Sequence, residues 1–171
     1  MFGFAYLHLA DTLLYINIQI GGSLALLICL RDYWNSDAVK HLLAMCMWAD
    51  GEAIEQELNS YNAEESKDLF GCFINGELAG LVGIIRLGGH TLEISHLAVQ
   101  QKWRGKGIAR VMITEISKTA GIETITAETD HEAAGFYRSA GFAVTSLGEK
   151  YPGVERFNCV LSVGAVAQSR M

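Results

Sequence analysis

Apolar and polar residues in the first third of the chain follow patterns that predict one strand and then two helices. Residues 24–31 form a continuous apolar run that ends in a charge, which is typical of a buried strand. Residues 35–50 begin with helix-capping types and then carry apolar residues at helical spacing, namely Val39, Leu42, Leu43 and Cys46. Gly51 interrupts this pattern, and residues 52–60 predict a second, shorter helix.

The middle of the chain predicts three antiparallel strands. Apolar runs at 69–74 and 77–86 flank an Asn-Gly pair, which readily takes the positive φ angles of a type I′ turn. A glycine-rich stretch at 87–90 predicts another tight turn and leads into a strand at 91–99. Because tight turns link consecutive strands, the three strands should form an antiparallel meander.

The last third of the chain predicts two further helices and three further strands. Helical spacing of apolar residues gives the helices, and a glycine, Gly121 or Gly141, ends each of them. The residues from Thr129 to Glu132 match a capping box, with Thr129 as the N-cap of the second helix. The predicted elements are a helix at 108–120, a strand at 122–129, a helix from the capping box to Gly141, and strands at 142–147 and 154–162.

These elements predict an α/β chain (α+β mixed sheet). An antiparallel meander is followed by a β-α-β-α-β-β order around a central mixed sheet, with helices on both faces. The length of 171 residues suits one domain, which we place at 26–162, with a C-terminal tail at 163–171. Residues 1–25 form an apolar N-terminal extension whose role the sequence does not assign.

Three interpretations of the extension at 1–25 stay open. No Lys or Arg precedes Arg31, so a signal peptide would lack its positive region. Residues 12–30 are uncharged and long enough to cross a bilayer, although polar and glycine residues interrupt them. The alternation at 16–20 favours an extra strand or an adventitious extension, and the alternatives are a membrane anchor and a dimer-contact segment.

Composition and charge exclude several classes of protein. Half of the residues are apolar and only one is proline, which is a globular composition. The net charge of −6, without a Lys/Arg cluster, argues against a nucleic-acid partner and mildly favours cationic substrates. The four cysteines are widely separated and the histidines lack metal spacing, so we expect no metal and reduced thiols in a cytoplasmic protein.

A glycine-rich segment at 104–109 separates the strand at 91–99 from the helix at 108–120. The first backbone N–H groups of a helix lack intrahelical partners, and glycines let a phosphate approach them closely. The segment therefore predicts a phosphate or pyrophosphate site made of main-chain amides. No Walker A string occurs, and Arg110 stands where a dinucleotide fingerprint needs glycine or alanine.

Two separated motifs resemble those of the GNAT superfamily of N-acetyltransferases. Residues 96–99 (His-Leu-Ala-Val) followed by 104–109 (Arg-Gly-Lys-Gly-Ile-Ala) resemble its acetyl-CoA motif, which carries an R/Q-x-x-G-x-G/A signature. Residues 133–142 are similar to its later A-x-x-F-Y-x-x-x-G-F motif. Both motifs stand in the expected order within 26–162, so the chain is identified as a member of this superfamily.

The resemblance implies which residues bind acetyl-CoA. Main-chain groups of Leu97 and Val99 would pair with the pantetheine arm as an added strand, and the amides of 104–109 would hold the pyrophosphate. Asp130 stands where many members have an asparagine that contacts the pantetheine region, whereas an ionised carboxylate can only accept hydrogen bonds. The implied cofactor-binding residues are Leu97, Ala98, Val99, Arg104, Gly105, Lys106, Gly107, Ile108, Ala109 and Asp130.

The resemblance also implies a general acid, Tyr137, because this residue stands at the tyrosine of the F-Y pair; the alternative is a core ring. Glu93 is the candidate base, since some family members carry a catalytic glutamate on this strand. On a regular strand Glu93 would share a face with Ser95, Leu97 and Val99. The alternatives are a solvated glutamate or a water relay, and His96 is expected to pack on the other face.

The function that follows is N-acetyl transfer from acetyl-CoA to a primary amine of a small molecule, peptide or protein, directly within a ternary complex. The alternatives are a non-catalytic acyl-CoA-binding sensor on the same fold and a membrane-tethered enzyme. We expect the first two helices and the loop at 147–154 to select the acceptor. Neither nucleic acid nor membrane is an expected partner, and the sequence leaves a homodimer open.

Overall fold

The computed structural model of the chain describes residues 16–20 and 22–164. Within these residues the strands are β1 (Ile16–Ile20), β2 (Ser23–Cys29), β3 (Lys67–Ile74), β4 (Glu77–Gly88), β5 (Thr91–Val99), β6 (Thr124–Asp130), β7 (Ala143–Tyr151) and β8 (Val154–Ser162). The helices are α1 (Ser36–Ala44), α2 (Gly51–Ala63), α3 (Ile108–Ile116), α4 (His131–Ser139) and a short 3₁₀ helix, η1 (Gln101–Trp103).

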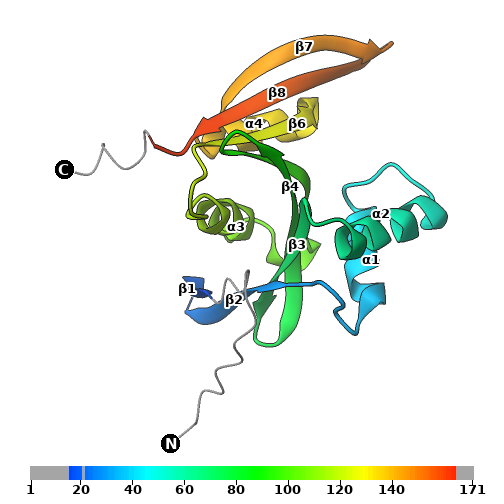
Figure 1. The fold of residues 1–171 in the computed structure, drawn as a ribbon, viewed down its shortest axis with the longest axis vertical. Coiled ribbons are helices and arrows are strands. Elements are labelled where there is room, and N and C mark those ends of the chain that lie inside the picture. Colours follow the sequence, from blue (N-terminus) through cyan, green and yellow to red (C-terminus); the bar gives the residue numbers. More distant parts are fainter. Residues whose placement is uncertain (1–15, 21, 165–171) are drawn as a thin grey trace, which may run out of the picture.

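One mixed sheet organises the described residues, with the strand order β1-β2-β3-β4-β5-β6-β8-β7. β5 and β6 are parallel, and the other neighbouring strands are antiparallel. The helices α1 and α2 lie on one face of the sheet and α3 on the opposite face (Figure 1). The predicted fold class, a mixed sheet with helices on both faces, is therefore confirmed.

Apolar side chains on the two faces of the sheet form two separate cores. The core on the α3 face also includes Tyr137 of α4 and alternate residues of the central strands, among them Phe70, Val82 and Leu92. The core on the other face joins α1 and α2 to residues such as Leu69, Leu81 and Ala98. The face to which each β5 residue points can therefore be read from the core that it joins.

The predicted meander is confirmed, and its first turn forms as the sequence indicates. Asn75 and Gly76 have φ angles of 52° and 81°, which match the left-handed geometry of a type I′ turn. Lys67 to Ile74 then pair with Ile85 back to Glu77, with one register shift next to Cys72. This hairpin brings β4 into the sheet centre, where it pairs with β5.

The segment between α1 and α2 differs from the prediction of a helix at 35–50. Asp50 has an extended conformation (φ −76°, ψ 174°), and its side chain accepts a hydrogen bond from the Ala53 backbone N–H at 2.9 Å. Asp50 is thus the N-cap of α2, and its conformation cannot continue a helix. α1 therefore ends at Ala44, residues 45–50 form a loop, and Gly51 begins α2 instead of separating two helices.

Two boundaries near the C-terminal half also differ from the prediction. α3 ends at Ile116, four residues before the predicted end, because the chain tightens into turns there. The loop predicted at 147–154 is wrong, since Tyr151 pairs directly with Val154 and leaves only a two-residue turn. β7 and β8 consequently form a long hairpin whose outer strand, β7, is mostly exposed.

A bulge in β5 decides where its side chains point. On β4 the neighbours Gly83 and Ile84 pair with His96 and Ile94 of β5, so Ser95 is an extra residue in that strand. An extra residue reverses the alternation of side chains along a strand. Before the bulge the even-numbered residues join the α3 core, whereas after it the even-numbered Ala98 joins the other core.

The strand predicted at 16–20 is present as β1, which pairs antiparallel with β2 at the edge of the sheet. Residues 1–15, which make up most of the predicted extension, and 165–171 of the predicted tail lie outside the described residues. Among the helices of the described ranges, none is both long enough and apolar enough to cross a membrane.

Candidate active site

A cleft of about 1120 Å³ opens where β5 and β6 diverge. The two strands pair only from Thr91 opposite Thr124 to Ile94 opposite Ala127, although both continue beyond that point. The loop after α1, the glycine-rich segment, the first turn of α3 and one side of α4 complete the cleft wall. Small-molecule pockets commonly measure roughly 300–1,000 Å³, so this cleft has room for a long ligand and a second small one.

The glycine-rich segment presents free backbone amides to this cleft. Gly105 and Gly107 have φ angles of 74° and 81°, in the left-handed region, and Gly107 directly precedes α3. Within the described part of the chain, the backbone N–H groups from Gly105 to Arg110 have no hydrogen-bond partner. The N-terminus of a helix carries roughly half a positive charge, so these amides can bind a phosphate or pyrophosphate.

Two of the predicted cofactor-binding residues use their polar groups differently from the prediction. The Arg104 backbone N–H donates to the Gln101 carbonyl at 3.2 Å, because η1 ends there, so the free amides begin one residue later. The Arg104 Nε donates to the Val99 carbonyl at 3.0 Å. This hydrogen bond occupies one of the main-chain groups that were expected to pair with the pantetheine arm. The Lys106 ammonium lies 4.6 Å from the centre of the Trp103 ring, and Lys106 does not line the cleft.

The stretch of β5 after the bulge forms one wall of the cleft and has no pairing with β6. Leu97 and Val99 pack toward the α3 core, whereas Ala98 is buried against the α1–α2 core. Burial raises the pKa of the Cys46 thiol to about 11, although the Leu97 backbone amide partly lowers this pKa. Cys46 of the α1–α2 loop and Leu97 of β5 both line the cleft.

Asp130, and not Thr129, caps α4. The Asp130 carboxylate accepts a hydrogen bond from the Ala133 backbone N–H at 3.0 Å, while Thr129 still belongs to β6. The predicted capping box is therefore wrong by one residue, because β6 continues to pair with β8 through Asp130. Asp130 lines the cleft, and one of its two oxygens is engaged by the cap.

Tyr137 of α4 contributes both to the core and to the cleft wall. Its ring packs edge-on against Phe136 and Phe142, at centroid distances of 5.3 Å and 5.1 Å. Burial, and to a lesser extent the nearby thiols of Cys159 and Cys46, raises the pKa of Tyr137 above its ordinary value. The phenol therefore stays protonated at neutral pH, as a proton donor must, and the core packing fixes its position.

The face predicted for Glu93 is wrong. The prediction placed Glu93 on the same face as Leu97 and Val99, but the extra residue Ser95 puts it on the opposite face. Glu93 does not line the cleft. A regular alternation was assumed for β5, and the bulge that breaks it has no signature in the apolar pattern of this strand.

A hydrogen-bonded group that the sequence did not predict lies at the bulge. The Tyr61 hydroxyl is 2.5 Å from Ser95 Oγ and 2.7 Å from His96 Nδ1. Tyr61 lies behind these two residues in α2 with 2% of its surface exposed, whereas Ser95 and His96 line the cleft. Gly83 of β4 faces this hydroxyl, and a Cβ there would lie 2.7 Å from the Tyr61 Cζ atom.

Sequence reasoning missed this group because Tyr61 and Ser95 are 34 residues apart, and neither carries a local motif. The one available signal was Gly83, since a glycine inside an apolar strand often marks a bulge or a close approach. His96 was expected to pack on the face opposite Leu97, and it does lie there. It nevertheless also reaches the cleft, because the strand edge is open at this point.

The loop after α1 forms an apolar part of the cleft wall, which we call the rim. Trp48 is fully exposed at this rim, beside two methionines and Cys46. Two acidic residues of α2 are paired with lysines. Glu55 pairs with Lys40, and Glu57 lies 3.6 Å from the Lys67 ammonium.

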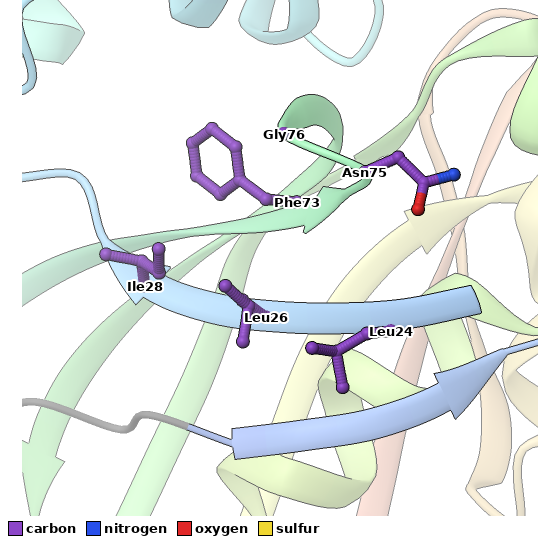
Figure 2. Close-up of a pocket in the computed structure, with 6 residues that line it drawn as sticks. All are labelled: Leu24, Leu26, Ile28, Phe73, Asn75 and Gly76. Atoms are coloured by element: carbon purple, nitrogen blue, oxygen red, sulfur yellow. The ribbon is translucent and has the colours of Figure 1, made fainter. Parts of the chain in front are cut away.

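A second, smaller hollow of about 330 Å³ lies away from the cleft, on β2 and the β3–β4 turn (Figure 2). Its walls are apolar side chains and the turn itself, formed by Leu24, Leu26, Ile28, Phe73, Asn75 and Gly76. These residues carry no titratable or nucleophilic group. Within residues 16–20 and 22–164, no three His, Cys, Asp or Glu side chains converge as a metal site would require.

Sequence comparison gives the chain a family. The model of the acetyltransferase (GNAT) domain matches residues 36–158. An uncharacterized protein of Mycobacterium leprae is 36% identical over 111 residues, which cover 58% of this chain and 28% of that protein. An uncharacterized N-acetyltransferase of Bacillus methanolicus is 28% identical over 64 residues, covering 37% of this chain and 53% of that protein. The chain thus spans about a quarter and about half of these two relatives.

Solved structures share the fold at low sequence identity. A spermidine N-acetyltransferase from Vibrio cholerae, described as dodecameric, has a TM-score of 0.70 at 16% identity, covering 86% of this chain and 98% of that one. A GNAT-family acetyltransferase from Desulfovibrio desulfuricans has a TM-score of 0.69 at 16% identity, covering 81% and 99%. Because the GNAT domain model matches most of its length, the chain belongs to the GNAT family of acetyltransferases, whose acetyl donor is acetyl-CoA.

Proposed function

We propose that this protein is an N-acetyltransferase that moves the acetyl group of acetyl-CoA directly to a primary amine within a ternary complex. The observation that carries the proposal is the shared cleft, which connects the free amides before α3 to the apolar rim after α1. A donor anchored at one end and an acceptor entering at the other would meet at the open edge of β5.

The donor end of the cleft suits a pyrophosphate followed by an extended arm. The unpartnered amides from Gly105 onward would bind the pyrophosphate, and the pantetheine arm would follow the unpaired stretch of β5. Main-chain amides of this stretch, near Leu97, would then polarise the thioester carbonyl. Asp130 would contribute only an acceptor, since its carboxylate already caps α4.

The chemical step requires a neutral amine and a protonated leaving group. A lysine-like amine has a pKa of roughly 10.4, so its neutralisation at pH 7 costs about 4.6 kcal/mol at 1.36 kcal/mol per unit. The amine nitrogen attacks the thioester carbon, the new C–N bond forms and the C–S bond breaks. The leaving thiolate has a conjugate acid of pKa roughly 8.5, by analogy with cysteine, so the protonated phenol of Tyr137 is a suitable donor.

The rim after α1 favours an amine carried on an apolar or aromatic body. Met45, Met47 and Trp48 offer polarisable and aromatic surface there, and Glu55 and Glu57 of α2 are paired with lysines. Spermidine acetyltransferases share the fold. The rim residues that line the cleft, 44–48, include no carboxylate that would suit a linear polycation.

The test is release of coenzyme A thiol over a panel of aliphatic, arylalkyl and polyamine acceptors. We expect amine-dependent release, and a loss of about 10- to 100-fold or more in kcat for Tyr137→Phe, with acetyl-CoA affinity retained. Acetyl-CoA binding without release above background hydrolysis for any amine would instead support a non-catalytic acyl-CoA-binding module. An unchanged rate in Tyr137→Phe would remove the tyrosine from the mechanism.

A further inference from the structure

The group formed by Tyr61, Ser95 and His96 holds an imidazole in one orientation at the cleft. The Tyr61 hydroxyl contacts His96 Nδ1, and the two rings meet edge-on with centroids 5.9 Å apart. Tyr61 cannot move away, because it is buried and Gly83 and Ser95 enclose its hydroxyl. In the described part of the chain, the second ring nitrogen of His96, Nε2, has no hydrogen-bond partner.

Burial outweighs the attraction of the nearest carboxylate and favours the neutral form of His96. Burial lowers the pKa of His96, Glu57 opposes this effect at 3.9 Å from Nδ1, and the Lys67 ammonium of β3 reinforces it. Burial also raises the pKa of Tyr61, so the hydroxyl beside His96 is uncharged. On the facing loop, Cys46 is a protonated thiol for the same reason. A neutral imidazole at the cleft can accept a proton at neutral pH.

We propose that His96 is the general base of the acetyl transfer, accepting the acceptor's proton at Nε2, and that Tyr61 is its positioning residue. This inference rests on the proposed function. In the required tautomer the Nδ1–H donates to the Tyr61 oxygen, and the Tyr61 O–H donates to Ser95 Oγ. That arrangement leaves the lone pair of Nε2 free for the substrate.

The protons balance with one base and one acid. An acceptor that arrives as an ammonium ion loses two protons when its nitrogen becomes an amide. Tyr137 supplies one proton to the coenzyme A sulfur and regains one from solvent, while His96 takes protons from the nitrogen and returns them to solvent. One proton is released per turnover, and no oxidant, reductant or metal takes part.

The nearby carboxylates are less suited to this role. Glu57 lies 3.6 Å from the Lys67 ammonium, and neither Glu57 nor Glu93 lines the cleft. Glu57 lies 3.9 Å from His96 Nδ1, so it can stabilise the imidazolium that forms during the reaction. A nearby carboxylate lowers the free energy of the protonated imidazole, so His96 accepts a proton more readily than an isolated buried histidine would.

The first experiment is the pH dependence of kcat/KM for the full-length chain, with acetyl-CoA and phenethylamine as the probe acceptor. Wild type should lose activity on the acid side with a midpoint below the ordinary histidine value of 6.5. His96→Gln should remove that limb and lower kcat/KM by about 10²- to 10⁴-fold, with acetyl-CoA affinity retained. Tyr61→Phe should keep the limb but shift its midpoint.

A second measurement separates a base from a structural role. The ratio of wild-type to His96→Gln rates is compared between phenethylamine and its β,β-difluorinated analogue, whose ammonium is more acidic and needs less help to deprotonate. If His96 is the base, this ratio should be smaller for the fluorinated amine. If His96→Gln only damages the fold, the two ratios should be equal, and that result would overturn the proposal. An active wild type with an unchanged His96→Gln variant removes only the base assignment. A wild type inactive with every amine overturns the proposed function itself.

Discussion

Gly83→Ala should disturb the cleft by adding one methyl group on β4, beside the bulge of β5. The new Cβ would lie 2.7 Å from Tyr61 Cζ, 3.2 Å from Ser95 Oγ, and closer still to the Tyr61 hydroxyl. Tyr61 has no room to retreat, since 2% of its surface is exposed. Overpacking of this kind costs about 1–3 kcal/mol. At about 2–4 °C per kcal/mol for a domain of this size, Tm should fall by about 2–12 °C.

The same substitution should also affect catalysis, because the displaced hydroxyl holds His96. Calorimetry measures the change in Tm. The pH profile of kcat/KM is the second measurement, and the midpoint of its acid limb should shift as it does in Tyr61→Phe. The matched control is Gly135→Ala at an exposed position of α4, where a Cβ meets no atom within 4 Å. That change should stabilise by about 0.5–1 kcal/mol. If Gly83→Ala left both Tm and the pH profile unchanged, the enclosure of the Tyr61 hydroxyl would be refuted.

Three smaller substitutions test other parts of the cleft. Gly107→Ala places a Cβ at a φ of 81°, which costs about 1–2 kcal/mol in the conformation that presents the amides. The free variant should relax out of this conformation and regain it on binding, so calorimetric titration should show acetyl-CoA affinity about tenfold weaker; equal affinity would contradict the amide site. Asp130→Ala should lower the free energy of unfolding, measured by urea titration, by about 1 kcal/mol because the cap of α4 is lost. Asp130→Asn keeps a capping oxygen and should retain most of that stability. Trp48→Ala should raise KM for arylalkyl amines more than for spermidine, and an equal rise for both would remove the aromatic rim from acceptor selection.

The elements that the sequence predicts well are those fixed by neighbouring residues. The Asn75-Gly76 turn, the glycine turn before α3 and the order of strands and helices all depend on local backbone preferences, and the structure contains them. Where prediction missed, the errors are near element ends: Asp50 caps α2, and Asp130 caps α4 in place of its neighbour. For α4, Thr129 and Asp130 are both suitable cap residues, and the pairing of β6 with β8 through Asp130 decides between them.

The site is less predictable than the fold because it depends on pairing between distant segments. Nothing near residue 95 indicates that β4 will pair with β5 through an extra residue, and the alternation rule then assigns Glu93 to the wrong face. Tyr61 reaches the bulge only after α2 has packed on the sheet. The family's motifs indicate the general acid and the residues that bind acetyl-CoA. The candidate base, in contrast, can be recognised only from tertiary contacts.

The bulge at Ser95 links the two halves of the proposed reaction. The pairing of β5 with β6 ends at Ile94, immediately before the bulge, so the strand edge that would receive pantetheine begins where the alternation changes. The same extra residue sets Ser95 and His96 side by side against Tyr61. A regular strand at this position would return Glu93 to the face of Leu97 and remove the imidazole from its partner. The strand edge that would receive the donor and the candidate base for the acceptor therefore both begin at this one extra residue.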